Sequence, residues 1–147
     1  MEKLNRNYHA KLQEMCDCYM DTDYLPELDR AVTSKSDDLE ESSIKYFALA
    51  ILEALTQKAA KLTIKKKEKA KVTVYSSDEK INLPPPTSEM ADTIFAIIRA
   101  ITHIDDAKGE SQFAFGLRNG QIDLTVKLKK KEGKESLKII FPELEPH

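Results

Sequence analysis

The chain has 147 residues, of which 41% are hydrophobic and 33% charged, with only four glycines and a formal net charge of −2. This length and composition indicate one globular domain with a real core and exclude a disordered or fibrous protein. Charge is uneven, because residues 1–57 hold twelve Asp and Glu against six Lys and Arg, whereas residues 58–147 hold thirteen against seventeen. Neither half is charged enough to demand nucleic acid as a partner.

The N-terminal sequence and the cysteines predict a cytoplasmic protein without membrane insertion. No run approaches the roughly 18 uninterrupted apolar residues of a membrane span, and the first residues lack the apolar centre of a secretory signal. Cys16 and Cys18 lie too close in sequence to staple distant elements, so we expect a fold that does not depend on disulfides.

The first predicted unit is a helical extension over residues 1–36. Apolar side chains recur at helical spacing between residues 2 and 19 and form one face: Leu4, Tyr8, Leu12, Met15 and Tyr19. A brief helix is expected around Tyr24–Leu28, before a polar connector over Thr33–Ser36. The apolar face of the first helix is a candidate partner interface.

The second predicted unit, residues 37–147, opens with a helix over 38–61. Asp37 or Asp38 can accept the free amide protons of its first turn, and its apolar positions follow a 3-4-3-4 rhythm. Tyr46 and Leu49 add a second apolar edge, which we expect to receive the first helix and which belongs to the same candidate interface.

Strands and a second helix follow. Alternating apolar and polar residues predict strands at Leu62–Ile64 and Val72–Val74, with a short third strand around Ile81–Leu83. Three prolines at 84–86 end this ladder, and a helix over 87–104 follows, with Thr87 or Ser88 as its N-cap.

The C-terminal part predicts three more strands. An Asn119-Gly120 turn of type I′ joins strands at Phe113–Leu117 and Ile122–Leu128, and a second turn through Lys130–Gly133 leads to Leu137–Phe141. One face of this sheet is apolar and the other polar, so helices should cover the apolar face alone. The predicted fold class is α+β: a two-layer sandwich, αββ(β)-α-βββ, with an antiparallel-rich sheet and an N-terminal helical extension.

Catalytic and metal-binding motifs are weak. The glycines are scattered and form no phosphate loop, and His103 at the end of the second helix fits a helix-dipole contact better than a catalytic base. His9, Cys16 and Cys18 suggest zinc, but residues two apart on a helix point about 200° apart, and no fourth ligand is found. We expect no enzyme activity, no metal and no cofactor.

Two lysine groups are candidate anion-binding residues: Lys65, Lys66, Lys67 and Lys69, and Lys129, Lys130 and Lys131. We place the first group in the connection between two strands and the second in a turn. A solvated rim is the default interpretation, because single-strand nucleic-acid binders interleave basic residues with stacking rings, which are few here. A small-ligand or nucleotide-binding regulatory domain that uses these turns is the alternative function.

Several short sequence segments, taken in order, are similar to those of a known protein family. Ala60–Ile64 forms a short strand directly after the first long helix, and Ile101–Ala107 covers the end of the second helix and the residues after it. Leu117–Val126 combines a glycine turn with a strand of alternating apolar and polar residues. In this order of elements, Ile51–Phe141 resembles the N-terminal domain that precedes the RecA-like motor of type II secretion and type IV pilus assembly ATPases. The resemblance implies an assembly role beside a motor.

The resemblance does not carry ATP hydrolysis over to this chain. Family positions whose arginines and acidic residues help bind nucleotide across a subunit boundary are Lys61, Thr63, Thr73 and Tyr75 here, and the sequence contains no counterpart of the motor domain. The leading hypothesis is therefore a noncatalytic interaction or assembly domain that docks on a protein partner or on itself, with nucleic acid not favoured.

Overall fold

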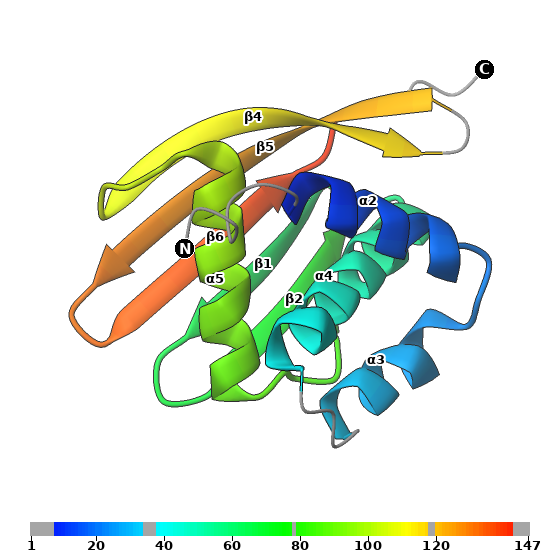
Figure 1. The fold of residues 1–147 in the computed structure, drawn as a ribbon, viewed down its shortest axis with the longest axis horizontal. Helices are drawn as coiled ribbons and strands as arrows, with labels where there is room; N and C mark the ends of the chain where they lie inside the picture. Colours follow the sequence, from blue (N-terminus) through cyan, green and yellow to red (C-terminus); the bar gives the residue numbers. More distant parts are fainter. Residues whose placement is uncertain (1–7, 34–37, 78, 118–119, 143–147) are drawn as a thin grey trace.

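The computed structural model describes residues 8–33, 38–77, 79–117 and 120–142. Four helices and six strands follow one another along the described chain (Figure 1): α2 (Tyr8–Tyr19), α3 (Tyr24–Thr33), α4 (Leu39–Thr56), β1 (Lys61–Lys66), β2 (Ala70–Ser76), β3 (Glu79–Asn82), α5 (Ser88–Thr102), β4 (Lys108–Leu117), β5 (Gly120–Lys131) and β6 (Lys134–Ile140).

All six strands form one antiparallel sheet in the order β3-β2-β1-β6-β5-β4. The strands β1 to β3 and β4 to β6 each form a three-strand unit whose members are neighbours in sequence. The two units join through β1 and β6, whose register runs from Lys61 opposite Ile140 to Lys66 opposite Glu135. This join brings segments about 70 to 80 residues apart in sequence side by side.

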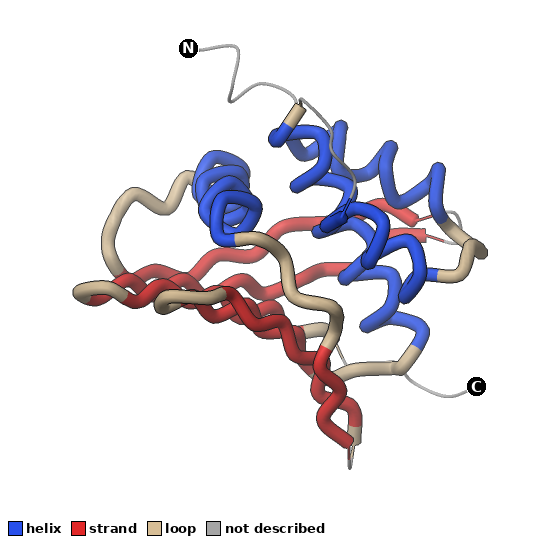
Figure 2. The backbone as a smooth tube through the Cα atoms, turned by 90° about the horizontal axis from the view of Figure 1, so that it is seen from below, coloured by secondary structure: helices blue, strands red, loops and turns tan. Residues whose placement is uncertain are grey.

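The helices lie on one face of the sheet, as the view along its plane in Figure 2 shows. The α+β class and the one-sided helix layer are therefore confirmed. Both α4 and α5 contact the sheet, whereas α2 and α3 pack against α4, and α2 also reaches β4. Leu12 and Leu28 from the predicted extension belong to the same apolar cluster as the sheet residues. The domain boundary near residue 36 stays a prediction.

Helix α4 begins as predicted and ends earlier than predicted. The Asp38 carboxylate accepts a hydrogen bond from the Glu41 amide at 3.0 Å, which caps the first turn. The predicted helix over 38–61 is wrong at its end, because Lys58 has a left-handed φ of 55° and the Ala59 amide donates to the Ala54 carbonyl at 2.9 Å. This 6→1 bond is the Schellman pattern that terminates helices.

Helix α5 is also slightly shorter than the predicted span of 87–104. Thr87 is its N-cap and accepts from the Met90 amide at 3.1 Å. His103 takes the C-cap position with φ 61°, so the helix ends there. The Tyr46 hydroxyl of α4 donates to the carbonyl of Pro84, which fixes the chain just before α5.

The strands are longer than the alternating patterns predicted. The β4–β5 pairing confirms the predicted hairpin but not the predicted Asn119-Gly120 turn, because Leu117 pairs with Gly120, which therefore belongs to the β5 ladder instead of the centre of the turn. Asn119 lies outside the described residues. Helix α3 likewise continues to Thr33 instead of ending at Leu28. The added residues are mostly polar, as at Lys65 and Lys66 of β1 and at Lys134–Ser136 of β6, although β6 ends at Ile140, one residue before the predicted end. An apolar pattern therefore underestimates strand length.

None of the helices in the described residues is both long enough and apolar enough to span a membrane. The cytoplasmic location remains a prediction from the sequence.

Candidate functional site

The sheet face that the helices leave uncovered, which we name the open face, is dominated by lysine. Directly paired residues point to the same side of a sheet, so the strand register identifies the members of this face. Its lysines in the described strands are Lys61, Lys65, Lys71, Lys80, Lys108, Lys127, Lys129, Lys131, Lys134 and Lys138. The register adds two carboxylates from these strands, Glu110 and Asp123, and Glu110 lies 3.9 Å from the Lys127 ammonium.

One row of the open face crosses five strands. Lys71 on β2 pairs with Lys65 on β1, which pairs with Ser136 on β6; Ser136 pairs with Lys129 on β5, which pairs with Lys108 on β4. Neighbouring strands lie about 4.8 Å apart. The small serine therefore sits between long cationic side chains.

A groove of about 490 Å³, the lysine groove, follows this row and is lined by all of its members except Lys108. It lies where the β1–β2 turn and the β5–β6 turn meet at one end of the sheet (Figure 1). Glu135 and Ser136 line it together with eight lysines: Lys65, Lys66, Lys67, Lys69, Lys71, Lys129, Lys131 and Lys134.

The lysine groove unites most of the predicted anion-binding residues. Both predicted groups contribute to it, although Lys65 and Lys66 belong to β1 and Lys130 and Lys131 to β5 instead of the connections in which we expected them. Lys130 does not line the groove. Lys130 pairs with Glu135, which pairs in turn with Lys66, and this row belongs to the helix-covered side of the sheet. Lys66 and Glu135 of the row nevertheless reach the groove at the end of the sheet.

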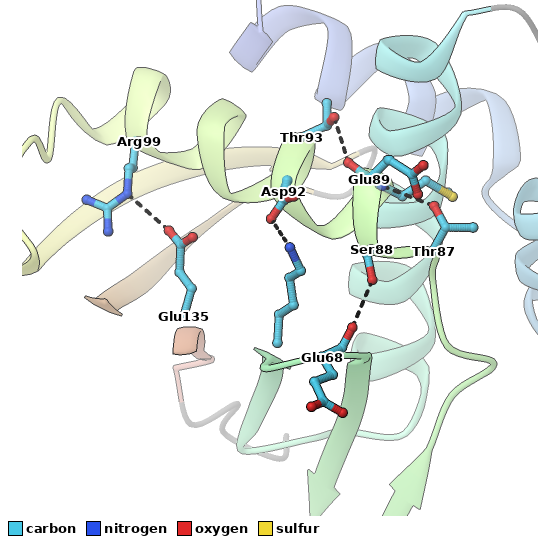
Figure 3. A network of polar contacts seen from close by, with 10 residues as sticks. Glu68, Thr87, Ser88, Glu89, Asp92, Thr93, Arg99 and Glu135 are labelled. Atoms are coloured by element: carbon cyan, nitrogen blue, oxygen red, sulfur yellow. Dashed lines mark hydrogen bonds and ion pairs between the residues drawn. The ribbon is translucent and has the colours of Figure 1, made fainter. Parts of the chain in front are cut away.

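Contacts from α5 hold the β1–β2 turn in place (Figure 3). The Ser88 hydroxyl donates to the Glu68 carbonyl at 3.2 Å, and the Lys66 ammonium lies 2.6 Å from the Asp92 carboxylate. Asp92 and Ser88 both come from the first two turns of α5, so the cap at Thr87 also positions this turn.

The carboxylates at the lysine groove are already engaged. Arg99 of α5 contacts Glu135 at 3.4 Å, and both side chains are less than one-fifth exposed (Figure 3). Asp92 neutralises Lys66. The seven other groove lysines make no ion pair within the described chain, so their charge is uncompensated.

Repulsion among these ammoniums is visible in one pKa. The neighbouring Lys131 charge lowers the pKa of Lys129, with smaller contributions from desolvation and from Lys108. Crowding of like charges at the end of the sheet thus disfavours the protonated form of Lys129.

The predicted partner interface lies mostly inside the molecule. Tyr8, Leu12, Tyr46 and Leu49 are buried between α2, α4 and the rest of the core, while Met15 and Tyr19 are partly buried against it. Leu4 lies outside the described residues. These side chains pack the extension onto α4, which confirms the expectation that the apolar edge of this helix receives the first helix. No finding tests whether they bind a partner.

The His9, Cys16 and Cys18 set does not come together. Cys16 is buried, where its thiol donates to the Ala48 carbonyl at 3.8 Å, while Cys18 is exposed. Burial raises the pKa of Cys16 to about 12. His9 instead contacts the Ala114 carbonyl at 2.7 Å on the edge strand β4. Within the described residues, no group of three or more His, Cys, Asp or Glu side chains is placed to hold a metal ion.

The candidate residues predicted from sequence did not include four that line the groove: Lys71, Lys134, Glu135 and Ser136. Lys71 and Lys134 adjoin the two predicted lysine groups, so proximity in sequence was an available signal. Ser136 enters the groove only through the pairing of β6 with β1, which no local pattern reveals.

Comparisons with known proteins support the fold. No protein-family model matches the sequence, and no curated protein matches it. Among solved structures, the chain is similar to the X-ray structure of the ATPase DotB of Legionella pneumophila, with a TM-score of 0.50 and 11% identity. The match covers 65% of this chain and 28% of the DotB chain. At this identity the likeness shows that the chain shares the fold of part of an ATPase.

Proposed function

We propose that this chain is a noncatalytic interaction or assembly domain that binds an acidic protein surface through its open face. Its role would resemble that of the N-terminal domain of type II secretion and type IV pilus assembly ATPases. The fold shared with part of DotB supports this relation. We propose further that the domain acts in a secretion or pilus assembly system and that it catalyses no reaction.

The observation that carries the proposal is the contrast between the two faces of the sheet. Helices cover one face, whereas ten lysines and two carboxylates of the described strands share the other. A broad surface of one charge sign speeds the encounter with an oppositely charged partner and selects against like-charged ones. The partner should therefore present Asp and Glu side chains.

A protein partner fits the open face better than a single-stranded nucleic acid. Proteins that bind single strands stack bases on exposed aromatic rings. Among the described open-face residues, Tyr75 carries the one aromatic ring, and the Lys61 and Lys80 ammoniums lie 4.6 and 5.8 Å from its centroid. Its ring is thus engaged by two cations and offers no run of stacking positions.

Site-specific photo-crosslinking in the native cells tests this proposal. A photoreactive amino acid is placed at Thr125 or Lys138 on the open face, and at Glu14 or Ala96 on the helix layer as matched controls. We expect one protein to crosslink from both open-face positions and from neither control. The purified pair should then bind, and K61E/K127E/K138E should weaken binding at least tenfold without lowering the melting temperature.

Two outcomes would overturn the proposal. Crosslinks that form only from Glu14 and Ala96 would move the interface to the helix layer. Crosslinks from Thr125 and Lys138 that lead to nucleic acid would replace the protein partner with a different class of molecule.

A further inference from the structure

The lysine groove differs from the rest of the open face in its density of charge. Seven lysines without an ion-pair partner in the described chain surround a space of about 490 Å³. Elsewhere on the face, charges are partly satisfied: Lys127 lies near Glu110, and Lys61 lies over the Tyr75 ring. The groove is therefore the part of this surface with the most unsatisfied positive charge.

The groove is also held in shape from behind. On the opposite side of the sheet, Ser88 and Asp92 of α5 fix the β1–β2 turn, and Arg99 contacts Glu135 at the start of β6 (Figure 3). These contacts fix the strand ends from which the groove lysines project. A site whose backbone is fixed in advance loses less entropy when a ligand binds.

We propose that the lysine groove binds a compact polyphosphate, meaning a free polyphosphate or the triphosphate of a nucleotide. Its volume falls within the range of about 300–1,000 Å³ typical of small-ligand sites. Each terminal phosphate carries up to about two negative charges and several acceptor oxygens, which suit clustered ammoniums and a serine hydroxyl.

The lining residues indicate that phosphates, and not a base, would be recognised. Lysine contacts phosphate as a point charge that adapts in direction, so a cluster can satisfy several phosphates without one fixed orientation. Among the described residues that line the groove, none carries an aromatic ring on which a base could stack. Free tripolyphosphate and ATP should therefore bind with similar affinity.

Titration calorimetry on the purified full chain at physiological ionic strength tests this proposal, with no protein partner present. The probes are tripolyphosphate, ATP, a single-stranded DNA oligonucleotide and polyglutamate. We expect saturable 1:1 binding of tripolyphosphate, with the ATP affinity within about threefold and both extended polyanions at least tenfold weaker. If ATP instead bound at least tenfold more tightly, base recognition would contradict the phosphate-only account.

Variants separate a built site from general attraction to the basic face. K65Q/K129Q should weaken tripolyphosphate binding at least tenfold, whereas K65R/K129R should retain it. The control, K61Q/K138Q, removes the same charge from the open face outside the groove and should change affinity less than twofold. Thermal unfolding of each variant checks that the fold is intact.

Three results would overturn the polyphosphate site: no saturable binding, equal losses in K65Q/K129Q and K61Q/K138Q, or tighter binding of DNA or polyglutamate than of tripolyphosphate. Because no partner protein is used, such a failure would leave the proposed interaction through the open face standing. Failed crosslinking from the open face would likewise leave the groove to be judged by calorimetry.

Discussion

Ile64 and Lys65 are neighbours on β1, yet they belong to opposite faces of one sheet. Ile64 is fully buried beneath the helix layer, whereas Lys65 is exposed on the open face and lines the lysine groove. The covered face buries apolar area, which stabilises the fold, while the open face holds like charges that do not. Stability and the proposed binding thus belong to alternate residues of the same strands.

The largest expected effect comes from this neighbouring pair. Ile64→Ala should lower the free energy of unfolding by about 2–5 kcal/mol, because it leaves a cavity in the core. Lys65→Ala should change it by no more than about 0.5 kcal/mol, because its side chain is exposed. Urea denaturation of both variants measures the difference, and equal losses would contradict the assignment of the two faces.

Two tyrosines give a second, smaller contrast. Tyr46 is fully buried and its hydroxyl donates to the Pro84 carbonyl, so Tyr46→Phe should cost about 1–2 kcal/mol. Tyr75→Phe is the matched control on the open face, where the hydroxyl makes no hydrogen bond within the described chain, and should cost less than about 0.5 kcal/mol. A larger loss from the Tyr75 variant would reverse this order.

The cap of α5 should have an intermediate effect on stability. Thr87→Ala removes the acceptor for the Met90 amide and should cost about 1 kcal/mol, whereas Thr87→Ser retains the hydroxyl and should cost less. Thermal unfolding at equal protein concentration compares the variants. If both substitutions cost the same, the hydroxyl contact does not stabilise the helix.

The smallest expected effect concerns the charges of the open face. The pKa of Lys129 is lowered from 10.5, first by Lys131, so Lys131→Gln should raise it. In the unfolded chain the pKa of Lys129 keeps its ordinary value. Below the lowered pKa of the folded state, protonated Lys129 therefore reduces the free energy of unfolding. Stability should rise as pH increases from there to about 10.5. Side-chain NMR titration measures the pKa, and an unchanged value in the variant would exclude the Lys131 contribution.

The sequence predicted the covered face better than the groove. Helical spacing identified α4 and α5, and alternation identified the strands, because burial imposes a period on apolar residues. Each helix start was predicted to within two cap candidates, of which Asp38 and Thr87 are the caps, because a cap depends only on the residues at its own helix start. The predicted ends of helices and strands were less accurate. Helix α4, for example, ends at the left-handed backbone conformation of Lys58, which the residue type lysine does not predict.

The groove escaped prediction because it depends on a long-range pairing. The two lysine groups were recognised as candidates, but only the antiparallel contact of β1 with β6 places Lys65 beside Ser136 and near Lys129. A pairing between strands distant in sequence leaves no local signature. The predicted partner interface differs from the groove in the opposite way. Leu12 and Leu49 were predicted from sequence as interface residues, but they are buried within the helix layer.

NMR of ¹³C-dimethylated lysines, which keep their charge, tests the central claim most directly, using the protein that crosslinking identifies as the ligand. Each lysine gives its own signal, so both faces are observed in one titration. We predict shifts for Lys61, Lys127 and Lys138 on the open face, with Lys11 and Lys45 of the helix layer unchanged. Shifts at Lys11 and Lys45 with an unchanged open face would contradict the account.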